Sequence, residues 1–466
     1  MSDPKSRRFF LGAMTAAAAT RVWGANDKIN VAIIGVGGRG TNHLNTYSRL
    51  PESRVAAICD VNQAAREVAN ATLLKNTSEK AKEFEDMRQA FADPGVDAVS
   101  IATPNHWHAL ATIWAMKAGK DVYCEKPACY NIHEGQKMIQ VSQETKKLVQ
   151  IGSQHRSTPF KMKAIAAMQQ GLIGKIYLSK GLCFKRRNTI GHAENSPTPP
   201  GVNWDLFLGP APMRPFNALR FKYNWHWFWD TGNGDIGNQG VHEMGIARWG
   251  LADPEFPKSA YAFGGKYAYT DDQETPNTLL SSFNYGDREL IFEVRGLLTG
   301  GEGTPPPARG GGRGGRGARG ASPDAAPPEA PAPTTVGPVN NPLNVAVGNL
   351  FYGTEGWAAM SDAGFQAYKG ESSEMIMEAR PERGQPGGDA TGLHMQNFLQ
   401  ACKSRNEKDL HDPVSNAYLS ASLCHLANIS YRVGRKLTLE AGPKFTGDAE
   451  ATKMITRDVY RKPYVV

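Results

Sequence analysis

A glycine-rich turn near the N-terminus has the spacing G-x-G-x-x-G, over residues 35–40. An apolar run at 28–34 precedes it, as a buried parallel strand would, and a helix is expected over 41–50. In such a turn the first glycine permits the tight bend, the second lets the backbone approach a pyrophosphate, and the last lets helix and strand pack closely. The helix N-terminus then offers N–H groups to the phosphates. The residues concerned are Gly35, Gly37, Gly38, Arg39 and Gly40. Their spacing predicts a dinucleotide-binding site.

An acidic residue stands where such a site would hold a ribose. The second expected strand, 55–60, ends in Asp60, 20 residues after Gly40. A carboxylate at this place accepts hydrogen bonds from the adenosine ribose hydroxyls and repels a 2′-phosphate. Arg39 is the opposing signal, because a guanidinium in the loop could meet that phosphate. The sequence therefore predicts NAD as the cofactor, with NADP less favoured.

Two polar motifs follow later strands of the same region. T-P-N-H-W-H comes after an expected strand at 96–102, and E-K-P comes after one at 119–124. Because doubly wound sheets place ligands at the carboxyl ends of their strands, both motifs are expected beside the cofactor. The candidate cofactor-binding residues in them are Thr103, Pro104, Asn105, His108, Glu125 and Lys126. His106 and His108 could be read as metal ligands, but no third ligand has suitable spacing, so no metal is expected.

The region from 223 to 243 combines aromatic, amide and histidine side chains. Four of the nine tryptophans lie at 225, 227, 229 and 249. Indole rings suit the apolar C–H faces of sugar rings, so the cluster favours a carbohydrate site; ordinary core aromatics are the alternative. The candidate substrate-binding residues are Arg156, Tyr223, His226, Trp227, Asn238 and His242. The last two are four apart and share one helical face.

With these motifs the chain resembles the Gfo/Idh/MocA oxidoreductases, which include glucose–fructose oxidoreductase and inositol dehydrogenase. The resemblance rests on the glycine-rich turn, the two strand-end motifs and the histidine region. It covers nearly the whole chain after the N-terminal segment, apart from residues 299–343. It implies that Lys126 lies between nicotinamide and substrate and hydrogen-bonds the reacting hydroxyl. It also implies that His242 is the catalytic histidine.

Asn238 departs from the pattern of that family, which is Asp-x-Gly-x-His. An amide cannot relay a proton or stabilise an imidazolium by charge. Lys126 is therefore expected to carry the proton transfer, with His242 as its partner. Asp235 is a candidate to replace the missing carboxylate, but a helix that begins at 236–238 would aim its side chain elsewhere.

The order of expected elements predicts two domains. Alternating strands and helices over 26–152 predict a doubly wound α/β domain with a parallel sheet, the Rossmann arrangement. Residues 153–466 carry successive strands, among them 175–184, 259–269, 277–285 and 288–297, and predict an α+β domain with a large, mostly antiparallel open sheet. In the resembled family the uncovered face of that sheet commonly makes dimers or tetramers, so a homo-oligomer is expected.

A Gly/Arg/Pro-rich segment at 299–343 interrupts the second domain. Such composition cannot bury a core, and we expect a disordered loop insertion. The segment is similar to an RGG sequence, but it has no aromatic residue and acidic residues nearly balance its arginines. Polyanion binding is the alternative interpretation.

Residues 1–25 are predicted to be an export signal. The run R-R-F-F-L at 7–11 followed by an alanine-rich stretch resembles a twin-arginine (Tat) signal, which implies the Tat export machinery as a partner and a periplasmic or otherwise exported protein. The alternative is a chance arginine pair before an alanine-rich helix. Part of the net charge of +8 lies in this segment, and the remainder is too weak to indicate nucleic-acid binding. No apolar stretch has the length of a membrane span, and the six scattered cysteines are expected to be free thiols, with one or two disulfides as the alternative for an exported chain.

The expected function is that of an NAD-dependent oxidoreductase acting on a hydroxyl of a sugar, polyol or glycoside. The same residues permit a redox-neutral glycosidase, in which transient oxidation, elimination and re-reduction release an aglycone. A non-catalytic sugar-binding protein is the third hypothesis, against which the intact glycine pattern and Lys126 argue.

Overall fold

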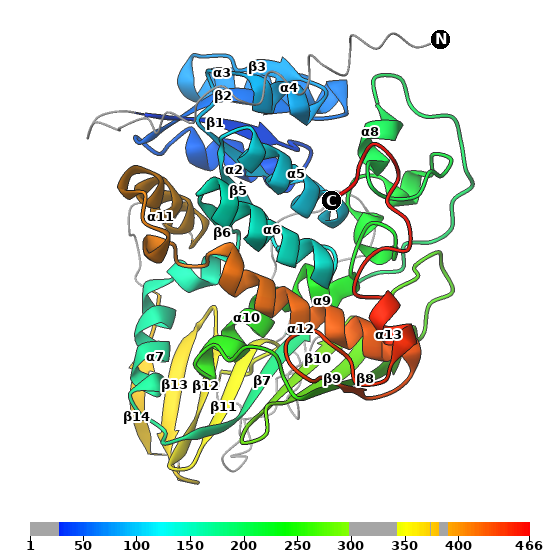
Figure 1. Cartoon of the computed structure of the whole chain (residues 1–466). Coiled ribbons are helices and arrows are strands. Elements are labelled where there is room, and N and C mark those ends of the chain that lie inside the picture. Colours follow the sequence, from blue (N-terminus) through cyan, green and yellow to red (C-terminus); the bar gives the residue numbers. More distant parts are fainter. Residues whose placement is uncertain (1–27, 298–342, 373, 382–389) are drawn as a thin grey trace, which may run out of the picture.

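A computed structural model describes residues 28–297, 343–372, 374–381 and 390–466. Figure 1 shows a parallel sheet with its helices in the upper half of the molecule and a broad, mostly antiparallel sheet with its helices in the lower half. The predicted segments 1–25 and 299–343 lie outside the described residues, apart from residue 343.

The N-terminal half is a six-stranded parallel sheet in the order β3-β2-β1-β4-β5-β6. Its strands are β1 (Ile29–Ile34), β2 (Ser53–Cys59), β3 (Lys82–Phe84), β4 (Ala98–Ile101), β5 (Asp121–Cys124) and β6 (Val149–Ile151). Its helices are α2 (Arg39–Tyr47), α3 (Gln63–Thr77), α4 (Met87–Ala92), α5 (Asn105–Lys117) and α6 (Ile132–Thr145). The strand order reverses between β1 and β4, as in a Rossmann fold, so the predicted fold of this half is confirmed.

The second half is a nine-stranded sheet in the order β14-β13-β12-β11-β7-β10-β9-β8-β15. Its strands are β7 (Ile176–Phe184), β8 (Ser259–Gly265), β9 (Thr278–Asn284), β10 (Glu289–Arg295), β11 (Val347–Gly353), β12 (Gly356–Ser361), β13 (Gly364–Lys369), β14 (Met375–Ala379) and β15 (Leu437–Thr438). All neighbours are antiparallel except β7 and β10. This confirms the predicted mostly antiparallel sheet.

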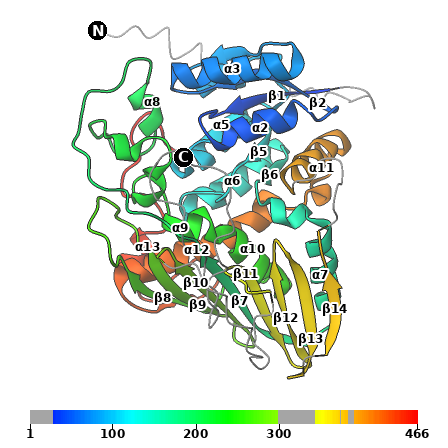
Figure 2. The same ribbon diagram turned by 180° about the vertical axis from the view of Figure 1, so that it is seen from behind.

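Helices cover one face of this sheet. They are α7 (Pro159–Gln169), α10 (Gly240–Gly250) and α12 (Val414–Val433). On the opposite side, which Figure 2 shows, no described helix lies over the strands. The remaining short elements are α8 (Trp204–Leu208), α9 (Gly234–Asn238), α13 (Ala449–Lys453) and 3₁₀ turns at Gln154–Ser157, Ala218–Arg220, Asn224–Trp227 and Glu407–Asp409.

Two late segments of the chain return to the Rossmann half. Helix α11 (Ala390–Ser404) buries Met395, Phe398 and Leu399 in one apolar core with the strands β1, β2 and β5. The C-terminal segment crosses to α5, where Tyr464 packs edge-on against Trp107 with ring centroids 5.4 Å apart. The first domain is thus completed by residues far beyond position 152.

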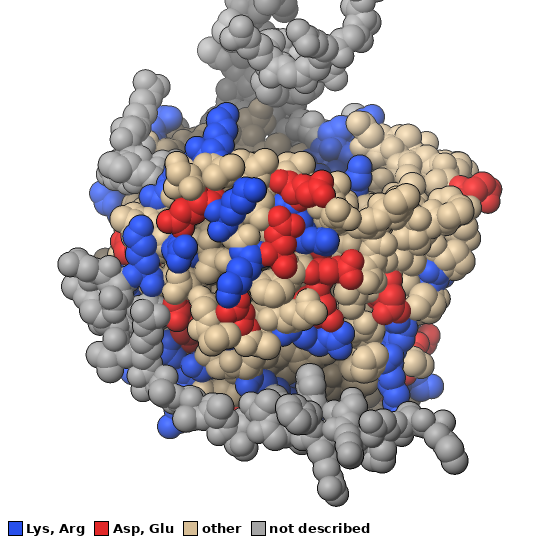
Figure 3. Space-filling model, turned by 90° about the horizontal axis from the view of Figure 1, so that it is seen from above, with Lys and Arg blue, Asp and Glu red and all other residues tan. Residues whose placement is uncertain are grey.

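All six cysteines are buried and free, which confirms the expected thiols. Within the described ranges, no helix has the length and apolar character needed to cross a membrane. Seen from above the Rossmann half, Figure 3 shows basic and acidic side chains interspersed rather than gathered by sign.

Candidate active site

A cavity of about 810 Å³ lies where the Rossmann half meets the second half. Most of the predicted site residues line it: Gly35, Gly37, Gly38, Arg39, Asp60, Thr103, Pro104, Asn105, His108, Glu125, Lys126, Tyr223, His226 and Asn238. Four predicted residues are not part of its lining, namely Gly40, Arg156, Trp227 and His242. The strand-end motifs are therefore brought together at one edge of the parallel sheet, as their spacing predicts.

The glycine-rich turn has the form that a pyrophosphate needs. Gly35 has a φ of +84°, and a Cβ on it would lie 2.9 Å from the carbonyl oxygen of Ala102. A Cβ on Gly40 would lie 1.7 Å from the Gly35 carbonyl oxygen, so only glycine lets α2 approach the strand this closely. Gly38 precedes α2 without a side-chain cap, which leaves N–H groups of the first turn for a ligand. The turn fits a dinucleotide.

Asp60 lies directly after β2 and faces this turn. Its Oδ2 accepts a hydrogen bond from the N–H of Val36 at 2.8 Å, and its Oδ1 accepts one from the N–H of Asn62 at 2.9 Å. Burial raises the pKa of Asp60, while these N–H groups act in the opposite direction. Each oxygen keeps a lone pair for a further donor, as binding of two ribose hydroxyls requires.

Arg39 points away from the ribose end of the cavity. Its Nε donates to Glu125 Oε1 at 2.7 Å, and its Nη2 donates to Thr391 of helix α11 at 3.2 Å. Arg39, which could meet a 2′-phosphate, is bound in this structure by the carboxylate of Glu125, which follows another strand. Arg66 donates to the Asp60 carbonyl oxygen at 2.6 Å.

Glu125 is the centre of a buried polar network. Its Oε1 accepts from Arg39 and lies 2.9 Å from Nε2 of His43, whose Nδ1 is 2.9 Å from Ser100 Oγ. Burial opposes its ionisation, but Arg39 and His43 outweigh this and hold the pKa of Glu125 well below its usual range. A fixed negative charge therefore lies beside Lys126.

The other strand-end motif is positioned by backbone contacts. Nδ1 of His108 lies 2.7 Å from the carbonyl oxygen of Pro127 and Nε2 lies 2.9 Å from that of Thr103, so the ring lies between the two motifs and donates to one of them. Asn105 donates to Asn233 Oδ1 at 3.0 Å and so links the first turn of α5 to α9. His106 faces the Phe207 carbonyl at 3.0 Å, and the described residues contain no group of three metal-ligating side chains.

Lys126 reaches across the cavity to the second half of the molecule. Its Nζ donates to the carbonyl oxygen of Asn238 at 2.6 Å and lies 3.5 Å from the Oδ1 of the same residue. Burial lowers the pKa of Lys126, while the charge of Glu125 acts to raise it. Uncharged oxygen atoms thus bind the ammonium in a partly desolvated position. There, loss of a proton to give the uncharged amine costs less free energy than in water.

Asp235 does not replace the carboxylate that Asn238 lacks. Both of its oxygens bind the guanidinium of Arg187, at 2.6 and 2.9 Å. Asn238 instead donates to the hydroxyl of Tyr223 at 3.0 Å. The side chain of Asp235 is thus engaged elsewhere, as predicted, although α9 begins at Gly234 rather than at 236–238 and Asn238 Nδ2 also lies 3.4 Å from Asp235 Oδ1.

His242 lies just behind the cavity wall, on α10. Its Nδ1 is buried without a hydrogen-bond partner, and its ring meets that of His155 edge-on with centroids 5.1 Å apart. Burial, together with the charge of Lys126, holds the pKa of His242 well below its usual range. His155 Nδ1 in turn lies 3.0 Å from Lys161 Nζ, which is 2.6 Å from Asp362 Oδ1.

Two predicted substrate-binding residues have other partners. Arg156 is buried, pairs with Asp253 at 2.6 Å and with Asp412 at 3.6 Å, and stacks on the ring of Trp249. It therefore holds the second domain together rather than facing the cavity. Trp227 is buried beneath the Arg187 guanidinium, whose carbon lies 5.3 Å from the ring centroid.

Two further basic residues that were not predicted, Lys185 and Arg187, line the cavity from the segment after β7. The signal was present, since K-R-R at 185–187 follows the expected strand 175–184. It was missed because an antiparallel sheet gives no rule for which strand ends face a ligand.

Comparison with known proteins supports this reading of both halves. Residues 29–153 match the model of an oxidoreductase family with an NAD-binding Rossmann fold, and residues 161–257 match the C-terminal alpha/beta domain of the same family. A glycosyl hydrolase family 109 protein of Saccharopolyspora erythraea is 30% identical over 205 residues, which are 40% of this chain and 44% of that protein. An inositol 2-dehydrogenase of Rubrobacter xylanophilus is 31% identical over 161 residues, 34% of this chain and 44% of that protein.

The solved structure of a levoglucosan dehydrogenase in complex with NADH and levoglucosan shares the fold, with a TM-score of 0.62 and 16% identity over 88% of this chain and 99% of that chain. The chain spans less than half the length of the curated relatives named above. Its two matched regions are the two domains of one family, in the order and with the folds described above. Residues 29–153 and 161–257 thus match the two successive domains of the Gfo/Idh/MocA oxidoreductase family, and the first of them is an NAD-binding Rossmann domain.

Proposed function

We propose that this protein is an NAD-dependent oxidoreductase that acts on a hydroxyl group of a sugar, polyol or glycoside. The observation that carries the proposal is the position of Lys126, whose Nζ lies between the glycine-rich turn of one half and Asn238 of the other. Relatives named as an inositol dehydrogenase and a levoglucosan dehydrogenase support the substrate class.

The cofactor is held by the residues whose shape fits it. The turn at Gly35 to Gly40 and the first N–H groups of α2 would hold the pyrophosphate, and Asp60 would hold the adenosine ribose. When bound, NAD supplies a nicotinamide that accepts a hydride from a substrate carbon atom.

Lys126 receives the proton of the reacting hydroxyl. Because burial lowers the pKa of its Nζ, the uncharged amine needed to accept a proton is available nearer to neutral pH. The Asn238 carbonyl oxygen at 2.6 Å orients the amine, and Glu125 stabilises the ammonium that forms. Burial and the charge of Lys126 lower the pKa of His242, the predicted partner of Lys126, and so keep this histidine uncharged.

The nucleotide retained on purification tests the cofactor assignment. The protein is purified without added nucleotide, denatured, and the supernatant is analysed by mass and absorbance. We expect NAD(H) close to one per chain. NADP(H) in its place would contradict the role given to Asp60.

A redox-neutral glycosidase is the second candidate, and the relative named as a family 109 glycosyl hydrolase favours it. The two reactions differ in their products. Net NADH formation with a free sugar or polyol supports the dehydrogenase, whereas aglycone release from a nitrophenyl glycoside without net NADH supports the glycosidase. If no substrate of this class gives either product, the remaining hypothesis is a sugar-binding protein.

We also propose export through the Tat machinery to the periplasm, on the R-R-F-F-L run at 7–11. Cell fractionation of the wild-type chain and of an Arg7→Lys, Arg8→Lys variant tests this, since only the paired arginines are read by that route. Retention of both forms in the cytoplasm would refute it.

Homo-oligomer formation is proposed from the face of the nine-stranded sheet that no described helix covers. Tyr177, Tyr261 and Phe263 expose about half of their surface on its strands. Sedimentation at micromolar concentration is expected to give a dimer or tetramer, and Phe263→Asp is expected to shift it toward the monomer.

A further inference from the structure

The wall that the second domain contributes to the cavity is positively charged. Lys185, Arg187 and Lys222 line it, and no aspartate or glutamate of that domain does. The acidic residues of the lining, Asp60, Glu85 and Glu125, all come from the Rossmann half, on the side of the glycine-rich turn.

Neighbouring groups neutralise this charge only in part. Arg187 is matched by the bidentate contact with Asp235. Lys185 is different, because its Nζ donates at 2.7 Å to Gln239 Oε1, an uncharged amide. Its charge therefore has no direct partner of opposite sign among the described residues that contact it.

The carboxyl groups behind Lys185 do not supply that partner. Gln239 donates to Glu243 Oε1 at 3.2 Å, but burial raises the pKa of Glu243 to about 8, so this carboxyl is mostly protonated at neutral pH. Asp362 also lies within the field of Lys185, but its Oδ1 is bound by Lys161 at 2.6 Å. An excess of positive charge remains at this end of the cavity.

Tyr223 adds a directed donor to the same wall. Its hydroxyl oxygen accepts from Asn238 at 3.0 Å and from Arg187 at 3.2 Å. With both lone pairs engaged, its own hydrogen is left to donate to a ligand. Lys185 and Tyr223 thus offer an ammonium and a hydroxyl hydrogen, and both require an acceptor.

We propose that the substrate is an anionic sugar, which carries a carboxylate or a phosphate group that Lys185 binds, with Tyr223 as a second donor. This rests on the proposed function, since it names the substrate class of the same cavity. An ammonium is a compact point charge that suits either anion. Lys185 and Tyr223 are both exposed, so a charged hydrogen bond here is expected to change affinity by about tenfold, the lower end of its usual range.

Binding to the NAD-loaded protein tests the proposal without turnover. Calorimetry compares each neutral sugar with its acidic counterparts: glucose, galactose and mannose against their uronates and 6-phosphates. We expect at least one acid to bind about tenfold or more tightly than its parent, and added salt to reduce that ratio. The uronate and phosphate arms distinguish the two anions.

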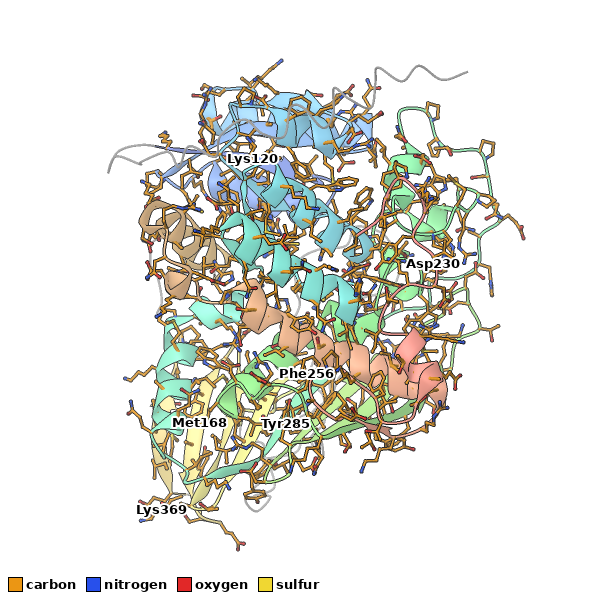
Figure 4. All side chains as sticks on the ribbon, in the orientation of Figure 1. Lys120, Met168, Asp230, Phe256, Tyr285 and Lys369 are labelled. Carbon is orange, nitrogen blue, oxygen red and sulfur yellow. The ribbon has the colours of Figure 1, made fainter. Side chains whose placement is uncertain are left out.

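Lys185→Met is expected to lower the acid-to-neutral affinity ratio by about tenfold. Lys369→Met removes one charge at the far end of the sheet (Figure 4) and is expected to leave the ratio unchanged. Tyr223→Phe is expected to lower the ratio by a smaller factor.

The proposal is overturned if no acid in the panel binds more tightly than its neutral parent, or if Lys185→Met leaves the ratio intact. These outcomes are separate from the fate of the proposed function. A protein that forms NADH from neutral sugars alone refutes the anionic substrate and keeps the oxidoreductase. A protein that binds the acids more tightly through Lys185 but never reduces NAD supports the anionic ligand and refutes the oxidoreductase.

Discussion

At the scale of single residues, the site depends on one amine held by a carbonyl group. Lys126 binds the main-chain oxygen of Asn238, and the adjacent carboxylate of Glu125 is already engaged by Arg39 and His43. The pKa of Lys126 is lowered because desolvation outweighs the attraction of Glu125. Burial therefore determines how readily Lys126 accepts a proton.

Replacing Lys126 is the direct test of this role. Lys126→Ala is expected to lower turnover by about 10²- to 10⁴-fold, the usual effect of losing a general acid–base group. The nucleotide content per chain should stay at the wild-type level, because the glycine-rich turn and Asp60 are untouched. An unimpaired rate in this variant would remove Lys126 from the mechanism.

The pH dependence of the rate follows from the same residue. Alcohol oxidation needs uncharged Lys126, so kcat/KM should rise with pH to a plateau, with a midpoint below the ordinary pKa of 10.5. His242 does not produce this limb, because its pKa lies well below 6.5. Profiles from pH 6 to 11 check this; a rate that rises only above pH 10.5 would contradict it.

Asp60 is expected to decide between the two nicotinamide cofactors. Asp60→Ala removes the acceptor of the ribose hydroxyls and the charge that repels a 2′-phosphate, so the affinity for NAD should fall far more than that for NADP. Fluorescence titration with NADH and NADPH measures both. Equal losses for the two nucleotides would show that Asp60 only supports the turn through Val36.

The sequence predicted those residues whose role is local. The glycine-rich turn, Asp60 and the strand-end motifs follow from spacing along the chain, and the structure brings them to one cavity. The partners of Arg39 and Asp235 could not be predicted from the sequence. Glu125 and Arg187 are distant from them in sequence and contact them only after folding.

At the scale of elements, helix α11 shows how the two halves depend on each other. Although it belongs to the later part of the chain, its apolar face fills a core with β1, β2 and β5. Within this core, Phe398 meets Tyr123 edge-on at 5.9 Å between ring centroids. A hydrogen bond from Arg39 to Thr391 of α11 also links this helix to the glycine-rich turn.

Truncation of this contact should destabilise the Rossmann half. Phe398 is fully buried, so Phe398→Ala is expected to lower the free energy of unfolding by about 3–5 kcal/mol. Val68→Ala, at a side chain 64% exposed on α3, is the control and should change it little. Denaturant titration compares them; equal effects would mean that α11 is not needed by the core.

Strands β11 to β14 were not predicted, although they form one side of the large sheet. Their sequences contain glycine and small residues, such as V-G-N-L-F-Y-G and G-W-A-A-M-S, which have no clear alternation. β11 pairs with β7, and each of the next three strands pairs with the strand before it; sequence patterns do not carry that information.

The same pairing predicts what deletion of 303–340 does. β10 and β11 flank β7, and Arg295 and Val347 lie at the same end of it, opposite Phe184 and Cys183. Arg295 and Val347 are thus two strand spacings apart, about 10 Å. After the deletion, residues 298–302 and 341–342 remain, and when extended they span roughly 23 Å, which is enough to join the two strands. Fold and activity should therefore survive; a fall in Tm of more than about 4 °C would show that the segment supports the fold.

At the scale of the whole molecule, the fold buries an unusual share of its histidines. Seven of the eleven are buried: His43, His106, His108, His226, His242, His394 and His425. Burial lowers the pKa of every one of them, to about 4 for His394 and His425. They are spread over both halves, so the molecule as a whole depends on keeping them uncharged.

Stability is therefore expected to fall as the pH drops from 6.5 toward 4. In this range the unfolded chain binds protons on these histidines and the folded chain does not, which costs up to about 1.4 kcal/mol per pH unit for each. Carboxyl groups whose pKa is raised by burial, Asp60, Glu134, Glu243 and Asp412, act in the opposite direction, but they are fewer. Denaturant titrations at pH 7, 6 and 5 measure the slope. His425→Gln should make it shallower, because one buried site is lost, whereas exposed His192→Gln should not, since Asp272 raises the pKa of that histidine instead. A free energy of unfolding that stays constant down to pH 5 would contradict the argument.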